Sequence, residues 1–90
     1  MQEGTLPGGD LIQAGIEDLS RGVESVPALL VSIGAPRLRR LGFSLPQPIS
    51  EPERRLYALL QAADSDAAHS RYNALIRRLV SFERAAECAR

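Results

Sequence analysis

The chain has no lysine and no tryptophan, and among its 90 residues it has one cysteine and one histidine. A single cysteine, Cys88, forms no internal disulfide, so we expect a reducing compartment, the cytoplasm. The paired-cysteine and His-Glu-x-x-His patterns of metal sites are missing, as are the glycine-rich patterns of nucleotide sites. No apolar stretch approaches the roughly 20 residues that span a bilayer, and no signal-peptide pattern opens the chain. We therefore expect no cofactor, no metal, no membrane contact and no catalytic activity.

The charges balance, with 11 basic residues against 11 acidic ones, so a strongly basic nucleic-acid binder is not indicated. All the basic residues are arginine, which we attribute to a GC-rich bacterial genome. Arginine also presents a planar fork that suits carboxylates and phosphates. The distribution is uneven, because residues 1–36 carry five acidic residues against Arg21, and residues 67–90 carry five arginines against two acidic residues.

A composition of 44% hydrophobic and 24% charged residues is that of an ordinary globular domain, and this length fits one domain. Residues 1–9 hold three glycines and a proline without periodicity, so they predict a flexible N-terminal tail. The remainder, residues 10–90, predicts a single helical domain.

The first helix is predicted from Asp10, which resembles an N-cap with Gln13 completing a capping box. Gly22 is the expected stop. After Asp10, apolar residues recur at helical spacing and form one stripe. It consists of Ile12, Ile16, Leu19 and Val23.

Ser25 predicts the cap of a second helix, and the apolar run 26–33 predicts burial on most sides. A buried strand is the alternative, because short apolar runs fit both structures. Pro36 is expected to break this helix after Gly34. A short helix over 36–41 would follow and would end at Gly42.

Residues 43–50 contain two prolines and predict an extended connector, which we expect Phe43, Leu45 and Ile49 to attach to the core. The segment 50–53 reads as a capping box for another helix. The buried stripe of that helix is expected to be Leu56, Leu59, Leu60 and Ala63. A polar turn at 64–66 then leads into a last helix over residues 66–89.

The last helix carries the strongest amphipathic pattern. Its apolar face consists of Ala68, Tyr72, Leu75, Ile76, Leu79, Phe82 and Ala86. About 22 residues span some 33 Å, which exceeds the comfortable width of a globule with a radius of gyration of roughly 12 Å. We expect the end with Phe82 and Ala86 to stay uncovered. Ordinary core packing of the whole face is the alternative.

The pattern as a whole predicts an all-α fold, a compact bundle of four main helices plus one short helix, with a long C-terminal amphipathic helix. The residues that we expect in the core are Ile16, Leu19, Leu29, Leu30, Ile33, Leu56, Leu60, Leu75 and Leu79.

The favoured function is that of a small non-catalytic interaction protein, which forms a homodimer or docks on a larger protein. Its candidate interface is Tyr72, Leu75, Leu79, Phe82 and Ala86. The alternative is a nucleic-acid-binding accessory factor, such as a small repressor or an antitoxin-like regulator. Its candidate contacts to anions or acidic partners are Arg37, Arg39, Arg40, Arg71, Arg77, Arg78 and Arg84. For the arginines of the last helix, the other interpretation is a solvated face that forms salt bridges with the acidic first helix.

The segment 29–41 matches a helix-turn-helix poorly, because its second helix would be short and would carry few polar residues besides arginine. His69, with Asp66 and Asn73 nearby on the same helix, is read as a surface histidine rather than a catalytic base. Cys88 is read as an ordinary exposed thiol.

Overall fold

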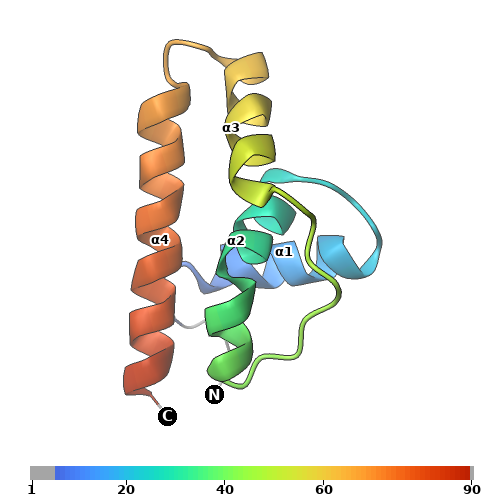
Figure 1. Cartoon of the computed structure of the whole chain (residues 1–90). Coiled ribbons are helices and arrows are strands. Elements are labelled where there is room, and N and C mark those ends of the chain that lie inside the picture. Colours follow the sequence, from blue (N-terminus) through green and yellow to red (C-terminus); the bar gives the residue numbers. More distant parts are fainter. Residues whose placement is uncertain (1–5, 90) are drawn as a thin grey trace.

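The second helix is the centre of an all-helical fold (Figure 1). The structure, a computed structural model, describes residues 6–89, and these residues contain no strand. The four helices are α1 (Gly9–Ser20), α2 (Val26–Arg40), α3 (Pro52–Ala63) and α4 (Ala68–Cys88). Helix α2 packs against each of the other three. Residues 28–31 have no exposed surface, which confirms the prediction of a buried helix over the predicted alternative of a strand.

Helices α3 and α2 lie one after the other along α4. Figure 1 shows α3 beside the N-terminal half of α4 and α2 beside its C-terminal half, with α1 crossing behind α2. The molecule measures 38 × 25 × 18 Å, and its radius of gyration of 12.5 Å is that of the predicted compact globule. Two helices in tandem therefore cover the length of α4.

The predicted break at Gly34 and Pro36 is wrong, and so is the separate short helix over 36–41. Helix α2 continues through Pro36 to Arg40, so the described residues form four helices and no fifth. Proline removes one backbone hydrogen bond at a cost of about 3 kcal/mol. Here tertiary packing outweighs that cost, because Pro36 itself is exposed while Leu30 and Leu38 on either side are fully buried.

Three sequence signals for helix ends are confirmed, one at a serine that caps a helix and two at glycines that follow a helix. The side chain of Ser25 accepts a hydrogen bond from the N–H of Ala28 and so caps α2. Gly22 and Gly42 adopt positive φ angles of 72° and 103° directly after α1 and α2. After Gly42, the N–H of Phe43 donates to the carbonyl of Leu38 at 3.0 Å, the long bond of a Schellman motif.

Two predicted N-caps are wrong. Helix α1 begins at Gly9 with Gly8 as its cap, so Asp10 lies within the first turn. Helix α3 begins at Pro52 after Glu51, which has a φ of 50°, so the capping box expected at Ser50 does not form. In both cases Asp10 and Glu53 still place acidic charge at the positive end of the helix.

Most of the predicted core is confirmed. Buried residues are Leu19, Leu29, Leu30, Leu56, Leu60 and Leu79, and those partly buried against them are Ile16, Ile33 and Leu75. The predicted stripes of α1 and α3 are too wide, because Val23 is 44% exposed beyond the end of α1, Leu59 is 40% exposed and Ala63 is exposed as well. Residues 1–5 of the predicted tail lie outside the described residues. Leu6 packs partly buried against the core, and Gly9 is already helical.

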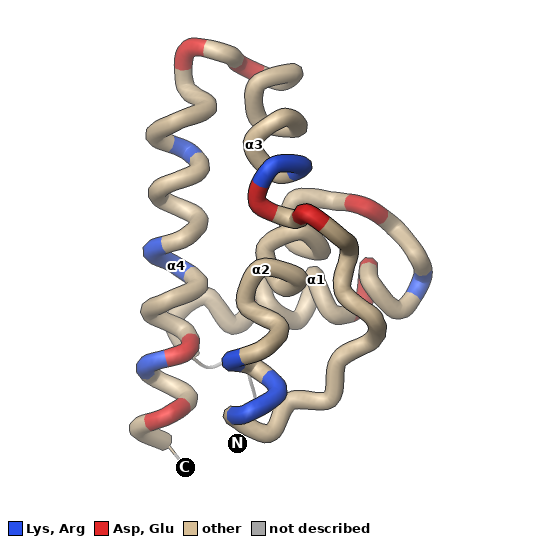
Figure 2. Tube along the Cα trace, in the orientation of Figure 1, with Lys and Arg blue, Asp and Glu red and all other residues tan. Residues whose placement is uncertain are grey.

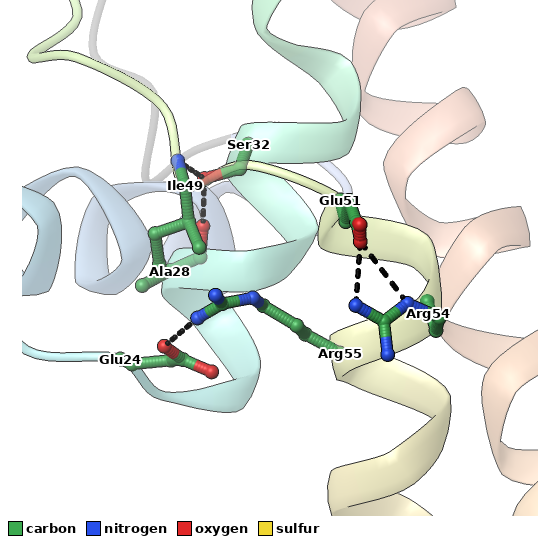
Figure 3. A network of polar contacts seen from close by, with 7 residues as sticks. All are labelled: Glu24, Ala28, Ser32, Ile49, Glu51, Arg54 and Arg55. Atoms are coloured by element: carbon green, nitrogen blue, oxygen red, sulfur yellow. Dashed lines mark hydrogen bonds and ion pairs between the residues drawn. The ribbon is translucent and has the colours of Figure 1, made fainter.

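The connector between α2 and α3 is held to the core by a serine. The Oγ of Ser32 donates to the carbonyl of Ala28 at 2.8 Å and accepts from the N–H of Ile49 at 3.0 Å (Figure 3). The ring of Phe43 packs on that of Phe82, with centroids 5.5 Å apart. The expectation that apolar residues of this connector attach it to the core is confirmed.

Replacing Ser32 with alanine is expected to destabilise the protein by about 1–3 kcal/mol, because the half-buried N–H of Ile49 loses its acceptor. Urea unfolding followed by circular dichroism measures this change. Ser44→Ala, at an exposed position of the same connector, is the matched control and should leave the midpoint in place. An unchanged midpoint for Ser32→Ala would mean that water replaces the hydroxyl without cost.

Candidate interaction surface

The apolar face of α4 belongs to the core along its whole length. Phe82 has no exposed surface, and Leu79 and Ala86 are 4% and 6% exposed. The expectation that Phe82 and Ala86 lie uncovered is therefore wrong. Phe43 of the connector packs on the ring of Phe82, Gly8 at the start of α1 lies close to it, and α2, which runs past Pro36, packs against α4.

The remaining two members of the predicted apolar interface, Tyr72 and Leu75, are half-buried. The ring of Tyr72 packs against that of Tyr57, with centroids 5.7 Å apart, which links α4 to α3. Burial, with a smaller contribution from the charge of Glu53, raises the pKa of the Tyr72 hydroxyl above its ordinary value. Both side chains thus contribute to packing within the chain.

The arginines at the end of α2 are engaged by the chain itself. The guanidinium of Arg37 lies 3.5 Å from the carboxylate of Glu87 and 3.9 Å from that of Glu83, both on α4. Arg39 donates to the carbonyl of Pro46 in the connector at 3.2 Å. Arg40 is exposed and acts on the charge of Glu83. Since α2 has no turn, the helix-turn-helix alternative at this segment is excluded.

Glu83 is the one acidic residue buried within the described part of the chain, at 5% exposure. Its carboxylate packs over Gly34, where a Cβ would lie 3.1 Å from Oε2. Burial raises the pKa of the Glu83 carboxyl above its ordinary 4.5, and the nearby charges of Arg37 and Arg40 offset only part of that rise. Glu83 therefore costs more when it is ionised than an exposed glutamate does.

Glu83→Gln is expected to raise the melting temperature at pH 7. The pKa of the Glu83 carboxyl is higher in the folded chain than in the unfolded chain, where it is near 4.5. The wild type therefore has its full stability below that unfolded-state pKa and loses part of it as the pH rises through the folded-state pKa. The advantage of the variant should therefore vanish near pH 4. Thermal unfolding at both pH values measures it, with the exposed Glu87→Gln as control. A variant less stable than the wild type at pH 7 would show that pairing with Arg37 outweighs burial.

The outward side of α4 carries positive charge only. We call it the arginine face, and it consists of Ser70, Arg71, Ala74, Arg77, Arg78, Ser81, Arg84 and Cys88, all exposed. At 3.6 residues per turn these positions fall within one arc of roughly 140°. Four of the eight are arginine and none is acidic. In Figure 2 the basic positions recur along α4, whereas the acidic positions of that helix lie only in its C-terminal half.

Most of this charge has no counterpart within the described chain. Arg78 lies 3.7 Å from the carboxylate of Asp10 at the start of α1, an exposed pair of the kind worth about 0–1 kcal/mol. This contact bears out the expected pairing of the last helix with the acidic first helix at one point. Arg71, Arg77 and Arg84 make no ion pair with any residue between 6 and 89.

A shallow hollow of about 300 Å³ lies within the arginine face. Its walls are mainly apolar, and they are formed by Pro7, Gly8, Ala74, Arg77, Arg78 and Ser81. Gly8 brings the start of α1 directly onto α4, because its φ of 75° suits glycine and a Cβ there would lie 3.1 Å from the carbonyl of Arg78. The arginine face is thus a charged surface around an apolar depression.

A second hollow, of about 320 Å³, lies where the C-terminal ends of α2 and α4 meet. It is lined by Arg37, Arg40, Leu41 and Glu87. Here a carboxylate of the chain already occupies the basic surface, because Glu87 contacts Arg37. We therefore expect this hollow to bind an external anion less well than the arginine face does.

His69 lines neither hollow. His69 is exposed, and one of its ring nitrogens lies 3.2 Å from the side-chain nitrogen of Asn73. Between residues 6 and 89 no three histidine, cysteine or acidic side chains gather as metal ligands. No helix in that same range is long and apolar enough to cross a membrane.

Comparison with known proteins found no match to this chain among family models, curated proteins or solved structures. Functional inference consequently depends on the surface itself.

Of the residues that line the first hollow, Arg77 and Arg78 are among the predicted contacts, whereas Pro7, Gly8, Ala74 and Ser81 are not. Ala74 and Ser81 are seven residues apart and project onto the arginine side of the helix, which a helical projection of the sequence could have revealed. Pro7 and Gly8 approach them only through the tertiary fold. No local pattern in the sequence indicates that approach.

Proposed function

We propose that this protein is a small, non-catalytic interaction protein that docks on an acidic surface of a larger protein through its arginine face. The observation that carries the proposal is the composition of eight exposed positions on one helix, with four arginines and no carboxylate. We place it in the cytoplasm, since its lone cysteine fits a reducing compartment.

The packing of α4 against the rest of the chain makes the arginine face suited to binding. Its opposite side is buried against α2 and α3, so the backbone that carries the arginines is held in one position. A surface ordered before binding loses less conformational entropy on association. Arginine offers a planar fork that matches a carboxylate with two parallel hydrogen bonds. The serines and alanine between the arginines are small enough to let a partner approach the helix closely.

Two observations favour a protein partner over nucleic acid. The net charge of the chain is zero, whereas nucleic-acid-binding domains are usually basic. Two of the three arginines at the end of α2, which a repressor or an antitoxin-like regulator would use, are held within the chain: Arg37 by Glu83 and Glu87, and Arg39 by the carbonyl of Pro46.

The partner that we propose is a different protein rather than a second copy of the chain. The case for a homodimer depended on Phe82 and Ala86 being uncovered, and both are buried within one chain. We expect the purified protein to scatter light as a monomer of 9.8 kDa. A stable dimer at micromolar concentration would return self-association to first place.

Photo-crosslinking in cells of the source organism tests the proposal. A photoreactive amino acid replaces Ala74 in the arginine face, and in the control it replaces Ala62, an exposed position of α3. We expect position 74 to capture a specific protein with an acidic surface and position 62 to capture none. Crosslinks to nucleic acid from position 74 would favour the nucleic-acid-binding alternative. Equal products from both positions would contradict a role for the arginine face.

A further inference from the structure

We infer that the hollow in the arginine face receives one apolar side chain of the partner, and that acidic residues flanking this side chain pair with Arg77 and Arg78. This inference rests on the proposed function and specifies the chemistry of the partner. The occupant is a protein segment in which an aliphatic or aromatic residue stands between carboxylates.

The placement of the arginines around the hollow supports this pattern. Arg77 and Arg78 follow Ala74 by three and four residues, so both lie one helical turn from it. They are consecutive and therefore leave the helix in directions about 100° apart. A ligand in the hollow thus has a guanidinium on each side. Of these two, Arg77 has no acidic partner within residues 6–89, and Arg78 has only the exposed Asp10.

The size and lining of the hollow indicate a single apolar anchor. About 300 Å³ is at the lower end of the range for small-molecule pockets, roughly 300–1,000 Å³, and the hollow is open to solvent. Its lining is mainly apolar and includes Pro7 and Ala74. Ala74 and Ser81 are about 10.5 Å apart along the helix, the length of roughly three extended residues. Three residues are enough for one anchor and a carboxylate on either side.

In the second hollow, the pairing of an arginine with a carboxylate already occurs within the chain. There Glu87 supplies the carboxylate for Arg37, beside Leu41. The arginine face has the arginines and the apolar depression, but its one carboxylate contact within residues 6–89 is that of Arg78 with the exposed Asp10. An acidic protein segment supplies both the carboxylates for the arginines and the apolar side chain for the depression.

The test uses the full chain, labelled with nitrogen-15, and two synthetic peptides. One peptide has a single leucine between two pairs of glutamates, and the other has serine in place of that leucine. We expect the leucine peptide to bind about tenfold more tightly, as burial of one leucine side chain implies. The largest amide shift changes should fall at Gly8, Ala74 and Ser81. Ala74→Phe, which fills the hollow, should abolish the advantage of leucine, whereas Ala62→Phe on α3 should not.

The outcomes separate this inference from the proposed function. If both peptides bind equally, and Arg77→Glu weakens both, the arginine face binds acidic segments but the hollow plays no part, so the inference is overturned alone. If neither peptide binds, or Arg77→Glu changes nothing, the proposed function falls with it. Tighter binding of the leucine peptide that survives in Ala74→Phe would also overturn the inference.

Discussion

Gly15→Ala should destabilise the protein by about 3 kcal/mol, although alanine is the better helix former. A Cβ at position 15 would lie 2.3 Å from the carbonyl oxygen of Pro27 and 2.5 Å from a methyl group of Val31. These contacts are far shorter than van der Waals distance, so α1 and α2 would have to separate. The gain in helix propensity, about 1 kcal/mol, is smaller than the cost of that separation.

Gly34→Ala is the control for this prediction, because Gly34 is also a buried helical glycine. A Cβ there would meet a methyl group of Leu79 at 2.8 Å and Oε2 of Glu83 at 3.1 Å, the ends of side chains that can turn aside. Urea unfolding should therefore show a much smaller loss for Gly34→Ala than for Gly15→Ala. Equal losses would mean that the backbones of α1 and α2 are not locked at Gly15.

Phe82→Ala should cost about 3–5 kcal/mol, the usual range for removing a buried aromatic ring. Phe82 has no exposed surface, and its ring contacts that of Phe43 in the connector. Such a loss is a large part of the roughly 5–15 kcal/mol that stabilises a typical domain. The cavity would open where α4 meets both the connector and the start of α1 near Gly8.

Leu59→Ala is the matched control, because Leu59 is a large apolar residue that is 40% exposed. Its loss should be well below that of Phe82→Ala in the same chemical unfolding experiment. A small effect at Phe82 would revive the earlier hypothesis that this part of α4 is an interface rather than core.

Local features of the structure were predictable from the sequence because their causes are local. Ser25 caps α2, and Gly22 and Gly42 end their helices, through bonds that span only a few residues. The division of α4 into an apolar and an arginine side likewise follows from helical periodicity alone. At Asp10 and Ser50 the local pattern was present, but a neighbouring glycine or proline fixed the boundary instead.

Features that depend on distant segments were not predictable. Pro36 breaks a helix in isolation, yet burial on both sides of it keeps α2 intact. Phe82 is covered in part by Phe43 and by the chain at Gly8, and both segments reach it only in the folded chain. The pairing of Arg37 with Glu87 joins residues 50 positions apart and is invisible in the sequence. For the candidate site, the arginines were predictable, whereas their availability and the hollow beside them required the fold.

The size of the native complex tests the central claim most directly. Extracts of the source organism are separated by size-exclusion chromatography at low salt, and the protein is detected by antibody. We predict that the wild type elutes within a larger complex that resists nuclease, while Arg77→Glu/Arg84→Glu elutes at the 9.8 kDa of the free chain with its fold intact. Arg21→Glu/Arg54→Glu, which makes the same change of charge at exposed positions off α4, should elute like the wild type. If all three proteins elute together, the arginine face is not the docking surface.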